Sequence, residues 1–101
     1  MTTTQLHETV EMMTSPSYKE RFKAEYIQTK IRYEKLKAFN TKIEAAHRTQ
    51  HLADVEGAIC VAMPKHDCPD DLLWDQQRMM GEYLHVLEIR AVIEGIDLSQ
   101  L

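Results

Sequence analysis

Residues 18–51 read YKERFKAEYIQTKIRYEKLKAFNTKIEAAHRTQH and contain neither Gly nor Pro. Glu, Lys, Ala, Gln and Arg dominate this stretch, and these residues favour the α-helix. Ser17, followed three residues later by Glu20, is a capping box for its start. The pattern predicts one helix from Tyr18 to about His51, roughly 50 Å long at about 1.5 Å per residue.

Two series of side chains follow this helix at seven-residue spacing, as in a helix that packs against another helix. One series is largely apolar and the other is polar or aromatic; they are Phe22, Thr29, Leu36 and Ile43, and Tyr26, Tyr33 and Asn40. Residues 70–94, DDLLWDQQRMMGEYLHVLEIRAVIE, repeat the arrangement with Leu73, Met80 and Leu87 beside Gln76, Tyr83 and Arg90. The matched spacing predicts an antiparallel helical hairpin.

The organisation expected from these patterns is a single all-α domain over residues 1–101. It has four parts: a short accessory helix within 1–16, a long basic helix over 17–51, an ordered connector over 52–67, and an acidic, apolar helix over 68–95. Asp67 or Cys68 is expected to cap the last helix, with Pro69 in its first turn and Gly95 after its end. Cys60 and Cys68 are expected to stay reduced in a cytoplasmic protein.

Charge is divided between the two long helices. Between Tyr18 and Arg48 there are nine Lys and Arg against four Asp and Glu, a balance of +5. From Asp54 onward, three Lys and Arg face ten Asp and Glu, a balance of −7. We expect the two helices to attract each other, within the hairpin or between protomers. The acidic half weakens attraction to nucleic acid, so a small anionic ligand is the alternative.

The last helix carries more apolar surface than one hairpin contact requires. A further seven-residue series consists of Leu72, Met79, Val86 and Ile93. A chain of 101 residues buries a thin core, so we expect this stripe to be the interface of a homo-oligomer. The alternative is a monomer in which the accessory helix completes a three-helix bundle.

The polar series admits two interpretations. In the predicted register the pairs expected to meet are Tyr26 with Arg90, Tyr33 with Tyr83, and Asn40 with Gln76. Each side chain stands where a hairpin would ordinarily place Leu, so each needs a hydrogen-bond partner or faces a cavity. Either they bond to one another and fix the register, or they line a binding pocket.

The binding interpretation includes the neighbouring cations. Tyrosine rings can stack on nucleobases, and Arg and Lys can hold phosphates through charge-assisted hydrogen bonds. The residues expected to bind the ligand are Tyr26, Lys30, Arg32, Tyr33, Tyr83 and Arg90. Such a pocket would hold a small nucleotide without changing it.

Two segments resemble a family of small helical proteins of tailed bacteriophages, named for a crAss-like phage member. The first is residues 18–36, YKERFKAEYIQTKIRYEKL, and the second begins CPDDLL at Cys68 and ends with EGI at 94–96. The resemblance spans about residues 17–98. It implies a phage or prophage origin. The start MTTTQLH has neither the cationic residues nor the apolar stretch of a secretory signal, so we expect the cytoplasm of the host cell. The family has no assigned activity, so it implies no catalytic residues.

Other motifs give little support to an enzyme or a metal centre. His47 and His51 are four residues apart, with His66, Asp67 and Cys68 in the connector, but this is not a recognised zinc spacing. No nucleophile with a base and an oxyanion donor is apparent. We therefore expect no cofactor, no metal, no catalysis and no membrane span.

The predicted function is that of a non-enzymatic phage accessory protein that counters host defence. Its favoured role is to sequester a nucleotide immune signal in the Tyr, Arg and Lys pocket. The alternative is an adaptor or inhibitor that binds a host protein through the apolar stripe.

Overall fold

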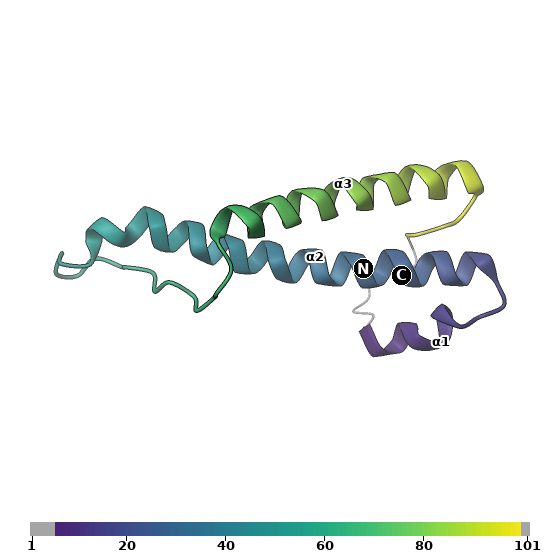
Figure 1. The fold of residues 1–101 in the computed structure, drawn as a ribbon, viewed down its shortest axis with the longest axis horizontal. Coiled ribbons are helices and arrows are strands. Elements are labelled where there is room, and N and C mark those ends of the chain that lie inside the picture. Colours follow the sequence, from purple (N-terminus) through teal and green to yellow (C-terminus); the bar gives the residue numbers. More distant parts are fainter. Residues whose placement is uncertain (1–5, 100–101) are drawn as a thin grey trace.

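The computed structural model describes residues 6–99 and is helical in all its regular structure over that range. Its elements are a 3-10 turn η1 (Leu6–Thr9), helices α1 (Val10–Met13) and α2 (Tyr18–Thr49), a 3-10 turn η2 (Gln50–Leu52), and α3 (Asp70–Glu94). Figure 1 shows α2 as the axis of an elongated molecule, with α3 along one side and α1 on another. The longest dimension is 59 Å.

Helix α2 begins where the sequence predicts. Ser17 has an extended backbone, and its Oγ accepts a hydrogen bond of 3.4 Å from the Glu20 amide. That bond satisfies one of the amides that a helix leaves free at its start. The helix then continues for 32 residues without a break, so the prediction of one long helix is confirmed.

Helix α3 begins at Asp70 and ends at Glu94, and the expected cap by Asp67 or Cys68 is wrong: Pro69 occupies the N-cap position and no side chain of the described residues caps the helix. The carboxylates of Asp70 and Asp71 lie in the first turn, where their negative charge interacts favourably with the positive end of the helix dipole. The helix ends at Gly95, whose φ of 71° is left-handed. The amide of Ile96 then bonds to the Ala91 carbonyl at 2.8 Å and turns the tail back toward the core.

Helices α2 and α3 form the predicted antiparallel hairpin. The core cluster between them lies toward the start of α2 and the end of α3; its buried members are Phe22, Tyr26, Leu84, Leu87, Ala91 and Ile96. Farther along, Ile43 and Asn40 are fully buried. The Asn40 amide donates to the Leu73 carbonyl at 3.1 Å and to Gln77 Oε1 at 2.9 Å.

The pairing of side chains differs in detail from the expected register. Tyr26 bonds to Glu88 rather than meeting Arg90. Tyr33 lies against Gly81 rather than Tyr83, and Asn40 bonds to Gln77 rather than Gln76. Each observed partner is one or two residues from the expected one. A seven-residue repeat identifies the stripe that faces a neighbour, but residues on both flanks of that stripe compete for each contact.

The accessory segment is shorter than a full amphipathic helix. Only η1 and α1 are helical, and residues 1–5 of the predicted segment lie outside the described residues. Gln28 on α2 holds the segment by donating to Thr9 Oγ1 at 2.8 Å. In Figure 1 α1 and α3 flank different sides of α2, so α1 does not cover the outer face of α3.

The connector over 53–69 has no regular structure after its first turns. It leaves the end of α2, which projects beyond the start of α3, and returns alongside it (Figure 1). The Val61 amide donates to Thr49 Oγ1 at 2.9 Å, which ties the middle of the connector to α2. The sequence predicted an ordered connector here but did not predict its path.

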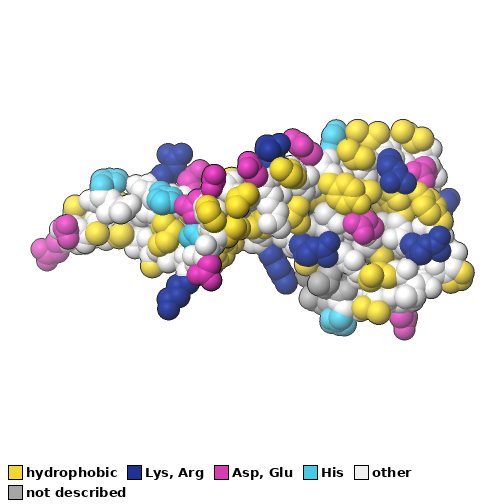
Figure 2. Space-filling model, in the orientation of Figure 1, with side chains coloured by type: hydrophobic (Ala, Val, Ile, Leu, Met, Phe, Trp, Pro, Cys, Tyr) yellow, Lys and Arg dark blue, Asp and Glu magenta, His cyan; other side chains and the backbone are white. Residues whose placement is uncertain are grey.

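Much apolar surface remains exposed. The stripe on α3 is exposed at every position: Leu72 by 54%, Met79 by 56%, Val86 by 49% and Ile93 by 77%. Figure 2 shows hydrophobic side chains gathered over the region where the helices lie together. Among residues 6–99 no helix is long and apolar enough to cross a bilayer.

Candidate functional site

A hollow between α2 and α3 brings together three of the six predicted ligand residues. Tyr26, Lys30 and Tyr33 line it from α2, because spacings of four and three residues place them on one face of the helix. From α3 it is lined by Gly81, Leu84 and Glu88, and Glu34 completes its rim. Its volume is about 250 Å³. We call it the tyrosine–lysine hollow.

Tyr26 forms the floor of the hollow. It is 5% exposed, and its hydroxyl donates to Glu88 Oε2 at 2.8 Å. Burial, followed by the hydrogen bond and the negative charge of Glu88, raises the pKa of Tyr26 to about 12. Its hydroxyl is therefore protonated at neutral pH and donates to Glu88.

Lys30 supplies a cation that forms no ion pair within the described residues. Its Nζ lies 5.7 Å from the centre of the Tyr26 ring, a cation–π contact. It forms none of the ion pairs found in residues 6–99, unlike Lys23, which pairs with Glu20 at 3.8 Å. The ammonium of Lys30 is thus available to an anion.

Tyr33 lies against the backbone of α3 at Gly81. A Cβ added to Gly81 would stand 3.2 Å from Cε1 of Tyr33 and 3.5 Å from its hydroxyl oxygen. The absent side chain therefore makes room for the ring. The Tyr33 hydroxyl forms no hydrogen bond within the described residues, although its ring packs on the core. A hydroxyl without a protein partner can donate to a ligand.

Tyr83 lies on the other flank of α3. Residues 81 and 83 are about 200° apart around a helix, so Tyr83 points away from the hollow. Its hydroxyl donates to Glu25 Oε1 at 3.2 Å. Burial and the nearby charge of Glu25 raise the pKa of Tyr83.

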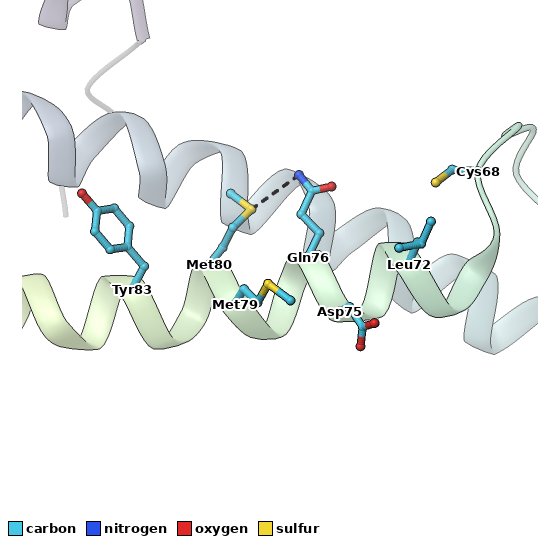
Figure 3. Close-up of a pocket in the computed structure, with 7 residues that line it drawn as sticks. All are labelled: Cys68, Leu72, Asp75, Gln76, Met79, Met80 and Tyr83. Carbon is cyan, nitrogen blue, oxygen red and sulfur yellow. Dashed lines mark hydrogen bonds between the residues drawn. The ribbon is translucent and has the colours of Figure 1, made fainter.

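Tyr83 closes one end of a second depression, which we call the methionine groove. The groove has a volume of about 450 Å³ and is lined by Cys68, Leu72, Asp75, Gln76, Met79, Met80 and Tyr83. Figure 3 shows these side chains along one side of α3, with Cys68 on the connector at the opposite end from Tyr83. Leu72 and Met79 also belong to the exposed stripe, so the groove is continuous with the predicted oligomer interface.

The two predicted arginines lie elsewhere. Arg90 donates to the Tyr18 hydroxyl at 2.8 Å and to Glu94 at 3.2 Å, and it lies 5.1 Å from the Phe22 ring centre. It fastens the end of α3 to the start of α2. Arg32 faces the accessory segment, in a depression of about 500 Å³ that His7, Val10 and Gln28 also line.

Sequence reasoning missed the acidic partners of the tyrosines. Glu88, Glu25 and Glu94 accept from Tyr26, Tyr83 and Tyr18, respectively. These pairs are 58 to 76 residues apart, and nothing in local spacing marks them. Gly81 did carry a signal, since a Gly inside a helical pattern often marks a close approach.

The histidines considered as metal ligands are arranged around one carboxylate. Asp70 lies between His47 and His66, with contacts of 2.7 and 2.6 Å. Within the described part of the chain, no three His, Cys, Asp or Glu side chains converge on a metal position. His51 and Cys68 are exposed and outside this cluster.

The comparisons with known proteins concern the first half of the chain. A family model described as Sequestin matches residues 16–58. No curated protein and no solved structure matches the chain. The matched residues run from the cap of α2 into the connector, and they include Tyr26, Lys30 and Tyr33 but no residue of α3. Over this stretch the chain is similar to the Sequestin family.

Proposed function

We propose that the protein sequesters a nucleotide immune signal of the host, binding it without chemical change in the tyrosine–lysine hollow. The protein would act as a phage accessory factor in the cytoplasm of an infected cell. The observation that carries the proposal is the pair of free donors in one hollow, the Lys30 ammonium and the Tyr33 hydroxyl.

The chemistry of these groups suits a nucleotide. An ammonium without a carboxylate partner attracts a phosphate, and a phenol hydroxyl can donate to a phosphate or ribose oxygen. The half-buried ring of Tyr33, beside the buried Tyr26, offers apolar surface to a base. The matched residues 16–58 contain all three side chains, and the name Sequestin is compatible with a sequestering role.

The size and charge of the hollow limit what one protomer can hold. Its volume of about 250 Å³ suits part of a nucleotide, and Glu34 and Glu88 also line it. Glu88 accepts the hydrogen bond from Tyr26, so Glu34 is the lining carboxylate that has no hydrogen-bond partner among the described residues. A second protomer would complete the site, and Arg32, Tyr83 and Arg90 would reach the ligand only from such a neighbour.

The test is native mass spectrometry of protein purified from defence-activated cells, followed by heat release and mass analysis of any bound molecule. We expect an intact nucleotide at a fixed ratio to protein chains. Lys30→Met should weaken binding by about tenfold or more, since a charge-assisted hydrogen bond contributes about 1.5–3 kcal/mol. Tyr33→Phe, which removes only the hydroxyl, should weaken it less.

Lys35→Met is the matched control, because Lys35 is exposed on another face of α2 and forms no ion pair within the described residues. It should bind like the unmodified protein. A protein that stays empty after exposure to cyclic and linear nucleotides would refute the proposal. Equal weakening by both Lys→Met changes would show that bulk charge, not the hollow, attracts the ligand.

The second candidate function is inhibition of a host protein through the apolar stripe. All four of its side chains are at least 49% exposed, which is unusual for so many neighbouring apolar residues on one flank. An empty protein that co-purifies with one host protein, and loses it on Val86→Glu, would favour this alternative.

A further inference from the structure

A cluster at the open end of the hairpin joins three separate segments. The Asp70 carboxylate, in the first turn of α3, receives His47 Nε2 on Oδ2 at 2.7 Å and His66 Nε2 on Oδ1 at 2.6 Å. His47 belongs to α2 and His66 to the connector. One carboxylate therefore links the connector to both long helices.

The second ring nitrogen of His66 also faces an acceptor. Nδ1 lies 2.8 Å from the Pro64 carbonyl oxygen, which can only accept. A neutral imidazole carries one N–H and can donate to one of these two oxygens, whereas an imidazolium donates to both. Both contacts are therefore hydrogen bonds to an ionised Asp70 and to Pro64 at the same time only when the ring is protonated.

The surroundings of His66 favour that form. The charged groups that face it are Asp70 on α3 and Asp67 on the connector, and Phe39 of α2 packs edge-on at 5.7 Å. The hydrogen bond to Asp70, then the one to Pro64, raises the pKa of His66, and partial burial opposes them. The bonds from His47 and then His66 lower the pKa of Asp70.

These directions fix the pH range in which the cluster is complete. A histidine whose pKa is raised by folding contributes stability below its ordinary pKa of 6.5, and that contribution is lost as pH rises through the folded value. A carboxylate whose pKa is lowered loses its contribution as pH falls through its folded value. Both groups are ionised between the two folded pKa values.

Few other polar contacts hold the connector. Among the described residues, the Val61 bond to Thr49 is the other hydrogen bond that joins 53–69 to the body of α2 or α3, apart from the first turn of α3 at Pro69. Cys68 follows His66 by two residues and lines the end of the methionine groove. Release of His66 would therefore free both the connector and that end of the groove.

We propose that His66 is a pH-sensitive latch: as an imidazolium it fastens the connector to Asp70, and loss of its proton lets the connector open. The latch is independent of the tyrosine–lysine hollow, which lies about three helical turns along α3.

The test has two readouts on the full chain. The imidazole carbon-bound protons of His66, followed by NMR, should titrate above 6.5 and move toward that value in Asp70→Asn. The Val61 amide, which donates to Thr49, should lose hydrogen-exchange protection several-fold over the same pH range, after correction for base catalysis of exchange. Amides at the middle of α2 should keep theirs.

His66→Gln and His85→Gln are the matched pair of variants. His66→Gln should leave connector protection low and independent of pH, while His85→Gln, which changes an exposed histidine on α3, should preserve the transition. If His66→Gln is poorly folded, Asp70→Asn alone suffices, since it should shift the transition to lower pH. Two results would overturn the latch. One is titration of His66 at or below 6.5, and the other is hydrogen-exchange protection of the connector that stays constant while His66 titrates.

Discussion

The ring of Tyr33 occupies the space that a side chain at Gly81 would fill, with 3.2 Å between Tyr33 Cε1 and the position of a Cβ. Gly inside a helix costs about 1 kcal/mol relative to Ala. The packing of the Tyr33 ring against α3 therefore explains why a Gly stands at this position despite that cost. It also connects the core of the hairpin to the candidate site.

Gly81→Ala should separate stability from binding. The added methyl must push the Tyr33 ring by a few tenths of an ångström, and the ring can tilt because it is only half-buried. We expect the free energy of unfolding to stay the same or rise by up to about 1 kcal/mol, while ligand affinity falls several-fold. Urea denaturation and ligand titration measure the two effects.

Glu82→Ala is the control, since it makes an exposed Ala one residue away. It should leave affinity unchanged. If Gly81→Ala bound ligand normally and unfolded more easily, the Tyr33 contact would be purely structural.

Tyr26→Phe should change the alkaline stability of the protein. Folding raises the pKa of Tyr26 from an ordinary 10.0 to about 12. The raised pKa contributes stability that is present below pH 10 and lost as pH rises toward about 12. The unmodified protein should therefore lose stability in this range more steeply than Tyr26→Phe does, as measured by urea denaturation at successive pH values.

At neutral pH the same substitution should cost about 1 kcal/mol, because it removes the hydrogen bond to Glu88. Glu88→Gln is the companion variant: it keeps an acceptor but removes the charge, so its alkaline loss should be intermediate. If the unmodified protein, Tyr26→Phe and Glu88→Gln all lost stability identically as pH rises, the alkaline loss could not come from the raised pKa of Tyr26.

The local signals in the sequence predicted the helices well. Ser17 and Gly95 mark the limits of α2 and α3 because capping depends on residues within one turn. The expected hairpin is also confirmed, since two seven-residue repeats leave few other ways to bury both stripes. The grouping of Tyr26, Lys30 and Tyr33 follows from the same helical periodicity.

The contacts between distant segments were not predictable in the same way. Arg90 could have faced a ligand, but Tyr18 and Glu94 engage it, and Tyr18 lies 72 residues away. The path of the connector depends on His66 and His47 both meeting Asp70, which requires both helices to be in place. Periodicity identifies the face on which a side chain lies, and tertiary packing selects its partner.

Asn40 should specify the register more than it stabilises the fold. It is fully buried, and its Oδ1 has no hydrogen-bond partner although its Nδ2 donates to Leu73 and Gln77. An unsatisfied buried acceptor offsets much of what the two bonds contribute. Asn40→Leu should therefore change the free energy of unfolding by less than about 1 kcal/mol, whereas Asn40→Ala, which also leaves a cavity, should lower it by about 2 kcal/mol.

Denaturation of both variants in urea gives these energies, and NMR spectra test the register. Asn40→Leu is expected to broaden or duplicate amide signals along α3, because one buried polar side chain can exclude alternative registers. A single sharp set of signals with unchanged contacts would show that other residues fix the register.

The exposed stripe should hold protomers together. Leu72, Met79, Val86 and Ile93 follow one flank of α3 at seven-residue spacing, and the accessory segment lies elsewhere. Val86→Glu places a charge within this stripe, while Val92→Glu places the same charge on a more exposed valine outside it. Because a charge buried at an apolar interface is costly, only Val86→Glu should dissociate the assembly.

Sedimentation over a range of concentrations should give the 11.8 kDa chain for Val86→Glu and a multiple of it for Val92→Glu. Both should keep the same helical circular dichroism, since neither valine is in the core. An unmodified protein that sediments as a single chain at every concentration would refute self-association. The alternative, that the stripe binds another protein, would then be favoured.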